Sequence, residues 1–171
     1  MIERKFNEEV SFQKLRLHSS ERISPWGSLF SKFKDSLADE DIRYYPNIKS
    51  SKAYSLLQDF YKYNNLLIGF GSDRCIKYFF ELHQQYSNVI TTDPNFPMYN
   101  VYSEMFNLKK IQVEYDKLSF PTKSILSKIT SDSIVVISNP SSPIGDLVNS
   151  VDILKILQTG VPVLLDEAYI E

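Results

Sequence analysis

Short apolar runs alternate along this chain with segments in which apolar residues recur every three or four positions. A run of four or five residues rich in valine, leucine and isoleucine is typical of a buried strand in a parallel sheet, and the longer spacing is typical of an amphipathic helix. The runs predict strands at residues 66–70, 88–92, 110–113, 134–137 and 161–165. The periodic segments predict helices that begin near residues 25, 51, 73, 98, 122 and 150. This alternation favours right-handed crossovers and therefore a parallel α/β sheet.

The last predicted strand ends in Asp166, the first charged side chain after a run of apolar residues. In open α/β sheets, ligands bind beyond the carboxyl ends of the strands, so Asp166 is a candidate site residue. An aspartate at this position could equally cap the turn that follows the strand. The choice between the two depends on what the other strand ends carry.

Three further loops are expected at the same carboxyl edge, at residues 71–73, 94–96 and 139–145. The first leads into a helix, and the free N–H groups of a helix N-terminus suit a phosphate, although Gly-Ser-Asp is also an ordinary turn and cap. Phe96 either packs in the core or offers a flat surface to a ring. With Asp166, the four loops offer a phosphate cradle, an aromatic platform, polar hydrogen-bonding groups and a carboxylate.

Composition and charge argue against several other functions. The 171 residues suffice for one domain with a substantial core. A formal net charge of -2 gives no basic surface of the kind that nucleic-acid binding requires. No apolar run is long enough to cross a membrane and the first residues lack the apolar core of a signal peptide, so a cytoplasmic protein without a membrane partner is expected. One cysteine, Cys75, and two distant histidines, His18 and His83, argue against a disulfide and a metal site.

Five motifs occur in a characteristic order and spacing. They are Tyr45-Pro46, Gly71-Ser72-Asp73, Asp93-Pro94-Asn95-Phe96-Pro97-Met98-Tyr99, Asn139-Pro140-Ser141-Ser142-Pro143-Ile144-Gly145 and Asp166-Glu167-Ala168-Tyr169-Ile170-Glu171. This ordered set resembles the fold-type-I pyridoxal-phosphate enzymes, most closely the histidinol-phosphate aminotransferase branch of the class I/II aminotransferases. The resemblance is clearest over residues 45–171.

The resemblance implies a fold, a cofactor and a reaction. The fold would be the three-layer parallel α/β sheet of the PLP-transferase large domain, present incompletely. Residues 1–43 would form an N-terminal arm and helix, and residues 44–171 a partial PLP-binding domain. The cofactor would be pyridoxal 5'-phosphate, and the reaction would transfer an amino group between an amino acid and a 2-oxo acid or a phosphorylated amine or aldehyde. A homodimer or a complementary chain is the expected partner.

The resemblance also assigns site residues. A carboxylate against the pyridine nitrogen keeps that nitrogen protonated, so the ring can accept electrons when the substrate loses a proton. The implied cofactor-binding residues are Asp166 at the pyridine nitrogen, Tyr169 and Ser142 near the ring oxygen, Phe96 against the ring, Ser72, Asp73 and Arg74 at the phosphate, and Tyr45 at the phosphate of the neighbouring subunit.

Two features depart from the family pattern. Ser142 occupies the position of the asparagine that holds the ring oxygen, and a serine is shorter. The Schiff-base lysine of the family lies downstream of the Asp-Glu-Ala-Tyr motif, and no lysine of this sequence stands in that place. The family's last strands also lie downstream, so the predicted strand at residues 66–70 is expected to lack its neighbours. No catalytic residue is therefore assigned.

Three interpretations remain open. The chain can be the amino-terminal portion of an aminotransferase, inactive by itself or one half of a split enzyme. It can be a non-catalytic protein that keeps the half-site for binding or assembly. It can be a different parallel α/β protein, such as a nucleotide-binding module, but no Gly-x-Gly-x-x-Gly or Walker loop is present. We favour the first interpretation.

Overall fold

A computed structural model describes residues 27–37, 43–45, 47–115, 117 and 119–170. The chain divides into two compact units, residues 1–66 and 67–171, which are described separately. The predicted N-terminal arm and the predicted start of the first helix near residue 25 lie outside the described residues, as do Pro46 of the first motif and Glu171 of the last. The predicted domain boundary after residue 43 stays a prediction.

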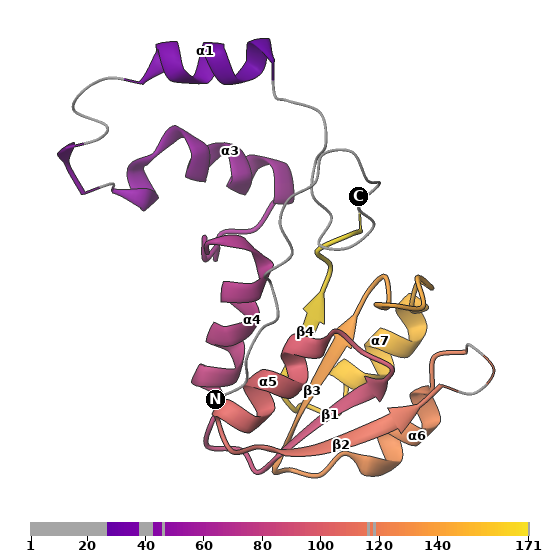
Figure 1. The fold of residues 1–171 in the computed structure, drawn as a ribbon. Coiled ribbons are helices and arrows are strands. Elements are labelled where there is room, and N and C mark those ends of the chain that lie inside the picture. Colours follow the sequence, from indigo (N-terminus) through magenta and orange to yellow (C-terminus); the bar gives the residue numbers. More distant parts are fainter. Residues whose placement is uncertain (1–26, 38–42, 46, 116, 118, 171) are drawn as a thin grey trace, which may run out of the picture. The chain divides into compact units, whose positions relative to one another are not determined.

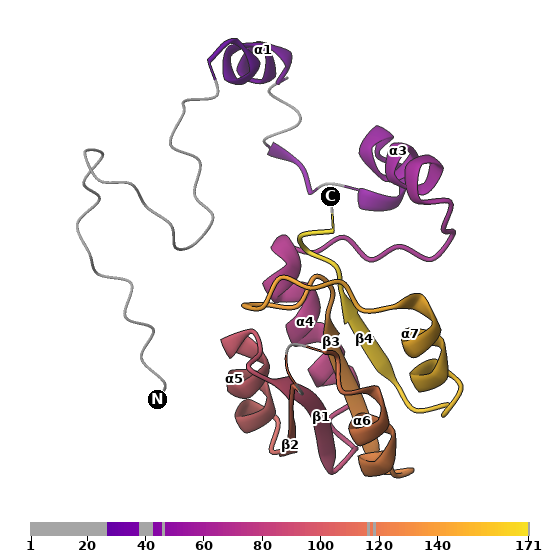
Figure 2. The same ribbon diagram turned by 90° about the vertical axis from the view of Figure 1, so that its right-hand side faces the viewer.

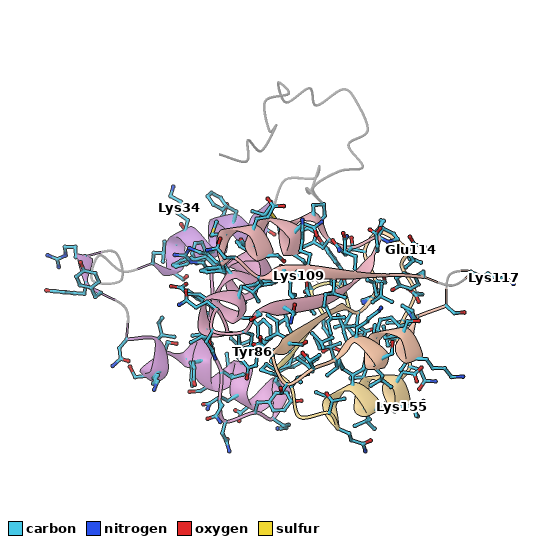
Figure 3. All side chains as sticks on the ribbon, turned by 90° about the horizontal axis from the view of Figure 1, so that it is seen from below. Lys34, Tyr86, Lys109, Glu114, Lys117 and Lys155 are labelled. Atoms are coloured by element: carbon cyan, nitrogen blue, oxygen red, sulfur yellow. The ribbon has the colours of Figure 1, made fainter. Side chains whose placement is uncertain are left out.

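The second unit is built on a parallel sheet, as predicted. Its four described strands run in the order β2-β1-β3-β4 (Figure 1). Their bounds are Asn88–Asp93 for β1, Lys109–Glu114 for β2, Ser133–Ser138 for β3 and Val163–Asp166 for β4. The labelled residues Lys109 and Glu114 mark the two ends of β2 in Figure 3. Since all four strands are parallel, their carboxyl ends meet at one edge of the sheet.

Helices cover both faces of this sheet and make three layers (Figure 2). Helices α4 (Gly71–Leu82) and α5 (Pro97–Met105) lie on one face, and α6 (Thr122–Lys128) and α7 (Ser150–Leu157) lie on the other. Successive strand residues point to opposite faces, which divides the buried side chains into two clusters. The first contains Ile76, Phe80, Val89, Tyr99, Tyr102, Leu108, Ile134 and Val136. The second contains Ile90, Val113, Ile125, Val135, Ile137, Val148 and Ile156.

The predicted buried strand at residues 66–70 is wrong. The segment is irregular, and Leu67 and Phe70 are 68% and 95% exposed. A strand satisfies its backbone groups only through a neighbouring strand, and no described strand pairs with this one. Strand β4 shows a weaker form of the same effect. It lies at the edge of the described sheet, and its residues are half-buried instead of fully buried on both faces.

The regular secondary structure described in the first unit is helical. Helix α1 spans Ser28–Ser36 and has no buried residue, and a 3-10 turn, η1, spans Ile48–Ser50. Helix α3 spans Lys52–Tyr61, and Ser51 caps it by accepting a hydrogen bond from the Tyr54 N–H. The Tyr54 hydroxyl donates to the Leu66 carbonyl at 3.3 Å and so ties this helix to the end of the unit. Within the described residues, no helix combines the length and the apolar character that crossing a membrane would require.

Candidate functional site

Asp166 is held by hydrogen bonds from two different parts of the fold. The Tyr99 hydroxyl of α5 donates to Asp166 Oδ2 at 2.6 Å. The Ala168 N–H, two residues after the strand, donates to Asp166 Oδ1 at 3.2 Å. The bond from the Ala168 N–H is the turn cap that the sequence offered as an alternative role for Asp166. The bond from Tyr99 is a further contact that such a cap does not need. Both carboxylate oxygens therefore have a fixed donor.

Tyr99 belongs to the hydrophobic core, with its ring 1% exposed. The ring packs edge-on against Phe96, with centroids 5.6 Å apart and planes at 81°. Burial, and next the bonded Asp166 carboxylate, raise the pKa of the Tyr99 phenol well above its usual range. The phenol therefore stays protonated and remains a hydrogen-bond donor to Asp166.

A small pocket opens at this edge of the sheet. Its lining is Ser72, Phe96, Ser138, Ser142, Asp166, Ala168 and Tyr169. Five of the eight predicted site residues are thus brought together from four separate loops. Its cavity volume of about 30 Å³ is far below the roughly 300–1,000 Å³ of a typical ligand pocket, so these residues form a shallow wall and do not enclose a ligand.

Two lining residues, Ser138 and Ala168, were not among the predicted site residues. Ser138 is the last residue of β3 and pairs with Asp166 across the parallel strands. Its hydroxyl donates to the Pro140 carbonyl at 2.9 Å and accepts from the Ser142 N–H at 3.3 Å. The signal that could have identified Ser138 was its place as the first polar residue after the apolar run of 134–137.

The loop that carries Ser142 is shaped by Asn139. Asn139 is buried, its Oδ1 accepts from the Val148 N–H at 2.9 Å, and its Nδ2 donates to Glu167 Oε1 at 3.4 Å. Gly145 has a φ of +86°, which an L-amino acid rarely adopts. Asn139 thus has a structural role, because it closes the loop over the end of β3 and joins it to the turn that follows β4.

The three remaining predicted residues do not line the pocket. Asp73 and Arg74 lie in the first turn of α4, after Ser72. The Asp73 carbonyl accepts from the Tyr102 hydroxyl at 3.3 Å, and the Arg74 guanidinium lies 5.3 Å from the centre of the Tyr78 ring. Tyr45 belongs to the first unit and is fully exposed.

Among the residues that line the pocket, none is a lysine. Lys155, labelled on α7 in Figure 3, bonds Asp152 at 2.8 Å, and Lys110 bonds Glu104 at 2.8 Å. In the described part of the chain, no group of histidine, cysteine and carboxylate side chains could hold a metal ion. The arrangement offers an anionic hydrogen-bond acceptor, an aromatic ring and hydroxyl groups.

A larger depression, of about 420 Å³, lies between residues 119–126 and α7. It contains none of the predicted site residues. Its Asp152 and Lys155 bond each other, and this contact lowers the pKa of Asp152 below its usual value. We place the candidate site at the smaller pocket, because that pocket gathers side chains from four loops around one anchored carboxylate.

Comparison with known proteins identifies the family of the chain. The family described as "Aminotransferase class I and II" matches residues 19–171. Histidinol-phosphate aminotransferase of Thermococcus kodakarensis is 33% identical over 130 residues, which are 74% of this chain and 38% of that protein. Histidinol-phosphate aminotransferase of Thermococcus gammatolerans is 28% identical over 148 residues, which are 85% of this chain and 43% of that protein.

A solved structure gives the same picture of the fold. Histidinol-phosphate aminotransferase from Sinorhizobium meliloti, crystallised in complex with pyridoxal-5'-phosphate, superposes with a TM-score of 0.70 at 19% identity. The match covers 85% of this chain and 41% of that one. The chain thus spans about two fifths of the length of these relatives. The family match and the fold confirm the resemblance found in the five motifs, and the chain belongs to the class I and II aminotransferases.

Proposed function

We propose that this chain supplies the wall of a pyridoxal-phosphate site in an aminotransferase of the histidinol-phosphate type, and that the 171-residue chain alone transfers no amino groups. The observation that carries the proposal is the anchored carboxylate of Asp166 beside the ring of Phe96 in one pocket. An anionic acceptor next to an aromatic face suits a protonated pyridine ring.

The residues present fit the cofactor group by group. Asp166 would accept a hydrogen bond from the ring nitrogen, and Phe96 would lie against the ring. Tyr169 and Ser142 would approach the ring oxygen. Ser72, in the first turn of the 12-residue helix α4, would meet the phosphate, with Asp73 and Arg74 following in the same turn. When bound, pyridoxal phosphate supplies an electron-accepting ring and a reactive aldehyde.

The protein's own contribution would be electrostatic and positional. The Asp166 carboxylate would keep a proton on the ring nitrogen, and Phe96 would exclude water from one face of the ring. The family suggests an amino acid and a 2-oxo acid, or a phosphorylated amine or aldehyde, as substrates. It also suggests a homodimer in which Tyr45 reaches the partner's phosphate, or a complementary chain that completes the site.

A second candidate is a non-catalytic protein that keeps this wall for binding or assembly. It is consistent with the absence of a lysine among the described pocket residues, because the aldehyde then has no amine to react with, and the first candidate shares this observation. The two candidates differ in what completes the site. A partner segment with a lysine at the pocket would restore transfer in the first case and is not needed in the second.

The test is a titration of the purified chain with pyridoxal phosphate, followed by absorbance. We expect saturable but weak binding, no cofactor retained on the protein after borohydride treatment, and no keto acid above the level made by the cofactor alone. Asp166→Ala should weaken binding by about 10-fold or more, because a charge-assisted hydrogen bond is lost.

Asp152→Ala is the matched control, since Asp152 is a carboxylate on α7 outside the pocket. It should leave the affinity unchanged. Unchanged affinity in Asp166→Ala would refute the site. Protein-dependent keto-acid formation with a panel of amino acids would refute the inactivity of the isolated chain.

A further inference from the structure

We propose that Tyr99 is a positioning residue, whose hydroxyl fixes the direction in which the Asp166 carboxylate faces the ring nitrogen of pyridoxal phosphate. This inference rests on the proposed function of the pocket. Tyr99 does not line the pocket itself. It would act through Asp166, from the buried side of α5.

The geometry explains why Asp166 needs a second anchor. It is the last residue of β4, which lies at the edge of the described sheet, and the backbone after it is irregular. The torsion that turns a carboxylate is broad and has no sharp rotamer wells. A single bond from the Ala168 N–H would leave the second oxygen free to swing. The Tyr99 bond to Oδ2 removes that freedom.

The donor is itself rigidly held. The Tyr99 N–H donates to the Phe96 carbonyl at 3.0 Å, and the Tyr99 carbonyl accepts from the Ser103 hydroxyl at 2.6 Å. The ring is buried in the first hydrophobic cluster, against Phe96. Phe96 also lines the pocket, so one packed pair sets both the carboxylate and the aromatic surface.

The chemistry of a phenol suits this task. A lysine or arginine at the same place would also bind Asp166, but its positive charge would offset the carboxylate's attraction for a protonated ring nitrogen. A neutral hydroxyl orients the carboxylate and leaves its negative charge in place. Among the described pocket residues there is no cationic side chain to cancel that charge.

The experiment compares two ligands on the full chain. One is pyridoxal phosphate, and the other is its analogue in which a carbon replaces the ring nitrogen. We expect Tyr99→Phe to weaken pyridoxal phosphate binding by about 3- to 10-fold, because the charge-assisted hydrogen bond that holds the Asp166 carboxylate is removed. Binding of the analogue should change by less than about 2-fold, because the analogue has no ring nitrogen for that carboxylate to meet. The affinity ratio between the two ligands is the readout, since a general loss of structure would lower both affinities.

Tyr102→Phe is the matched control. Tyr102 is also buried on α5, and its hydroxyl bonds the Asp73 carbonyl instead of Asp166. It should leave the affinity ratio unchanged. In an Asp166→Ala background, Tyr99→Phe should have no further effect on the ratio, because the residue through which it acts is gone.

A second measurement uses the wild-type chain, so it does not require any variant to fold. In wild-type chain labelled with 13C at the tyrosine Cζ, pyridoxal phosphate should shift the Tyr99 resonance and the carbon analogue should shift it much less. The proposed function would be overturned if Asp166→Ala left the affinity ratio between the two ligands unchanged, or if the wild-type chain bound pyridoxal phosphate without saturation. The role of Tyr99 alone would be overturned if Asp166→Ala removed the preference for pyridoxal phosphate over the analogue while Tyr99→Phe kept it. Equal shifts of the Tyr99 resonance with both ligands would overturn it as well.

Discussion

Ser138 at the end of β3 lies directly beside Asp166 at the end of β4, in the parallel register of the sheet. The Asn139 N–H, one residue further, donates to the Asp166 carbonyl at 2.8 Å. This pairing brings the loop that carries Ser142 next to the turn that carries Tyr169. The parallel register of two strands therefore builds most of the candidate site, and the remaining side chains come from the starts of α4 and α5.

Ser142→Asn should strengthen pyridoxal phosphate binding by a few-fold, about 2- to 5-fold, if the longer amide reaches the ring oxygen and adds one hydrogen bond. The reason is that the motif resemblance places Ser142 at the position of the family's asparagine. Absorbance titration of the two proteins measures the change. Ser142→Ala is the control and should lower affinity only slightly. Weaker binding in Ser142→Asn would show that the loop does not tolerate the longer side chain.

Because the pKa of Tyr99 is raised, we expect the stability of the folded chain to fall as the pH rises above 10. This pKa is raised in the folded chain, so above pH 10 the unfolded chain loses a proton that the folded chain keeps. The free energy of unfolding should then fall with pH by up to about 1.4 kcal/mol per unit from this residue. Urea denaturation between pH 8 and pH 11 measures it. Tyr99→Phe should reduce the slope above pH 10 and leave it unchanged below pH 9, and an equal slope in both proteins would contradict the burial of an ionisable phenol.

Ile156→Ala should destabilise the chain by about 2–5 kcal/mol, because it leaves a cavity in the second cluster where Ile156 is fully buried. Leu157→Ala is the matched control on the same helix, since Leu157 is about half exposed. It should cost clearly less. The shift of the urea midpoint measures both, and equal losses would show that α7 is packed differently.

Hydrogen exchange should separate the irregular segment from the sheet. The amides of Leu67 and Ile68 should exchange quickly, because no described strand pairs with them. The amides of Ile90 and Val135, in the two central strands, should exchange only on global unfolding. Strong protection at Leu67 and Ile68 would mean that this segment has found a partner strand, in a second copy or in another chain.

The apolar patterns of the sequence determined most of the fold of the second unit. The predicted strands at residues 88–92, 110–113, 134–137 and 161–165 all form, each within a few residues of its predicted bounds. Their period is local, so it can be read without knowing the neighbours. The sequence also predicted that the loops at residues 71–73, 94–96 and 139–145 would share one edge with Asp166, and Ser72, Phe96, Ser142, Asp166 and Tyr169 do meet there.

Only the tertiary structure decided the features that depend on contact with a distant segment of the chain. The run at residues 66–70 has the composition of a strand, but its backbone bonds must come from another strand, and the described chain provides none. In the sequence, Tyr99 is one more aromatic residue on a helix. Only the packing of α5 against the sheet places its hydroxyl 2.6 Å from Asp166, 67 residues away, because contacts between distant segments are set by how the layers pack and not by local period.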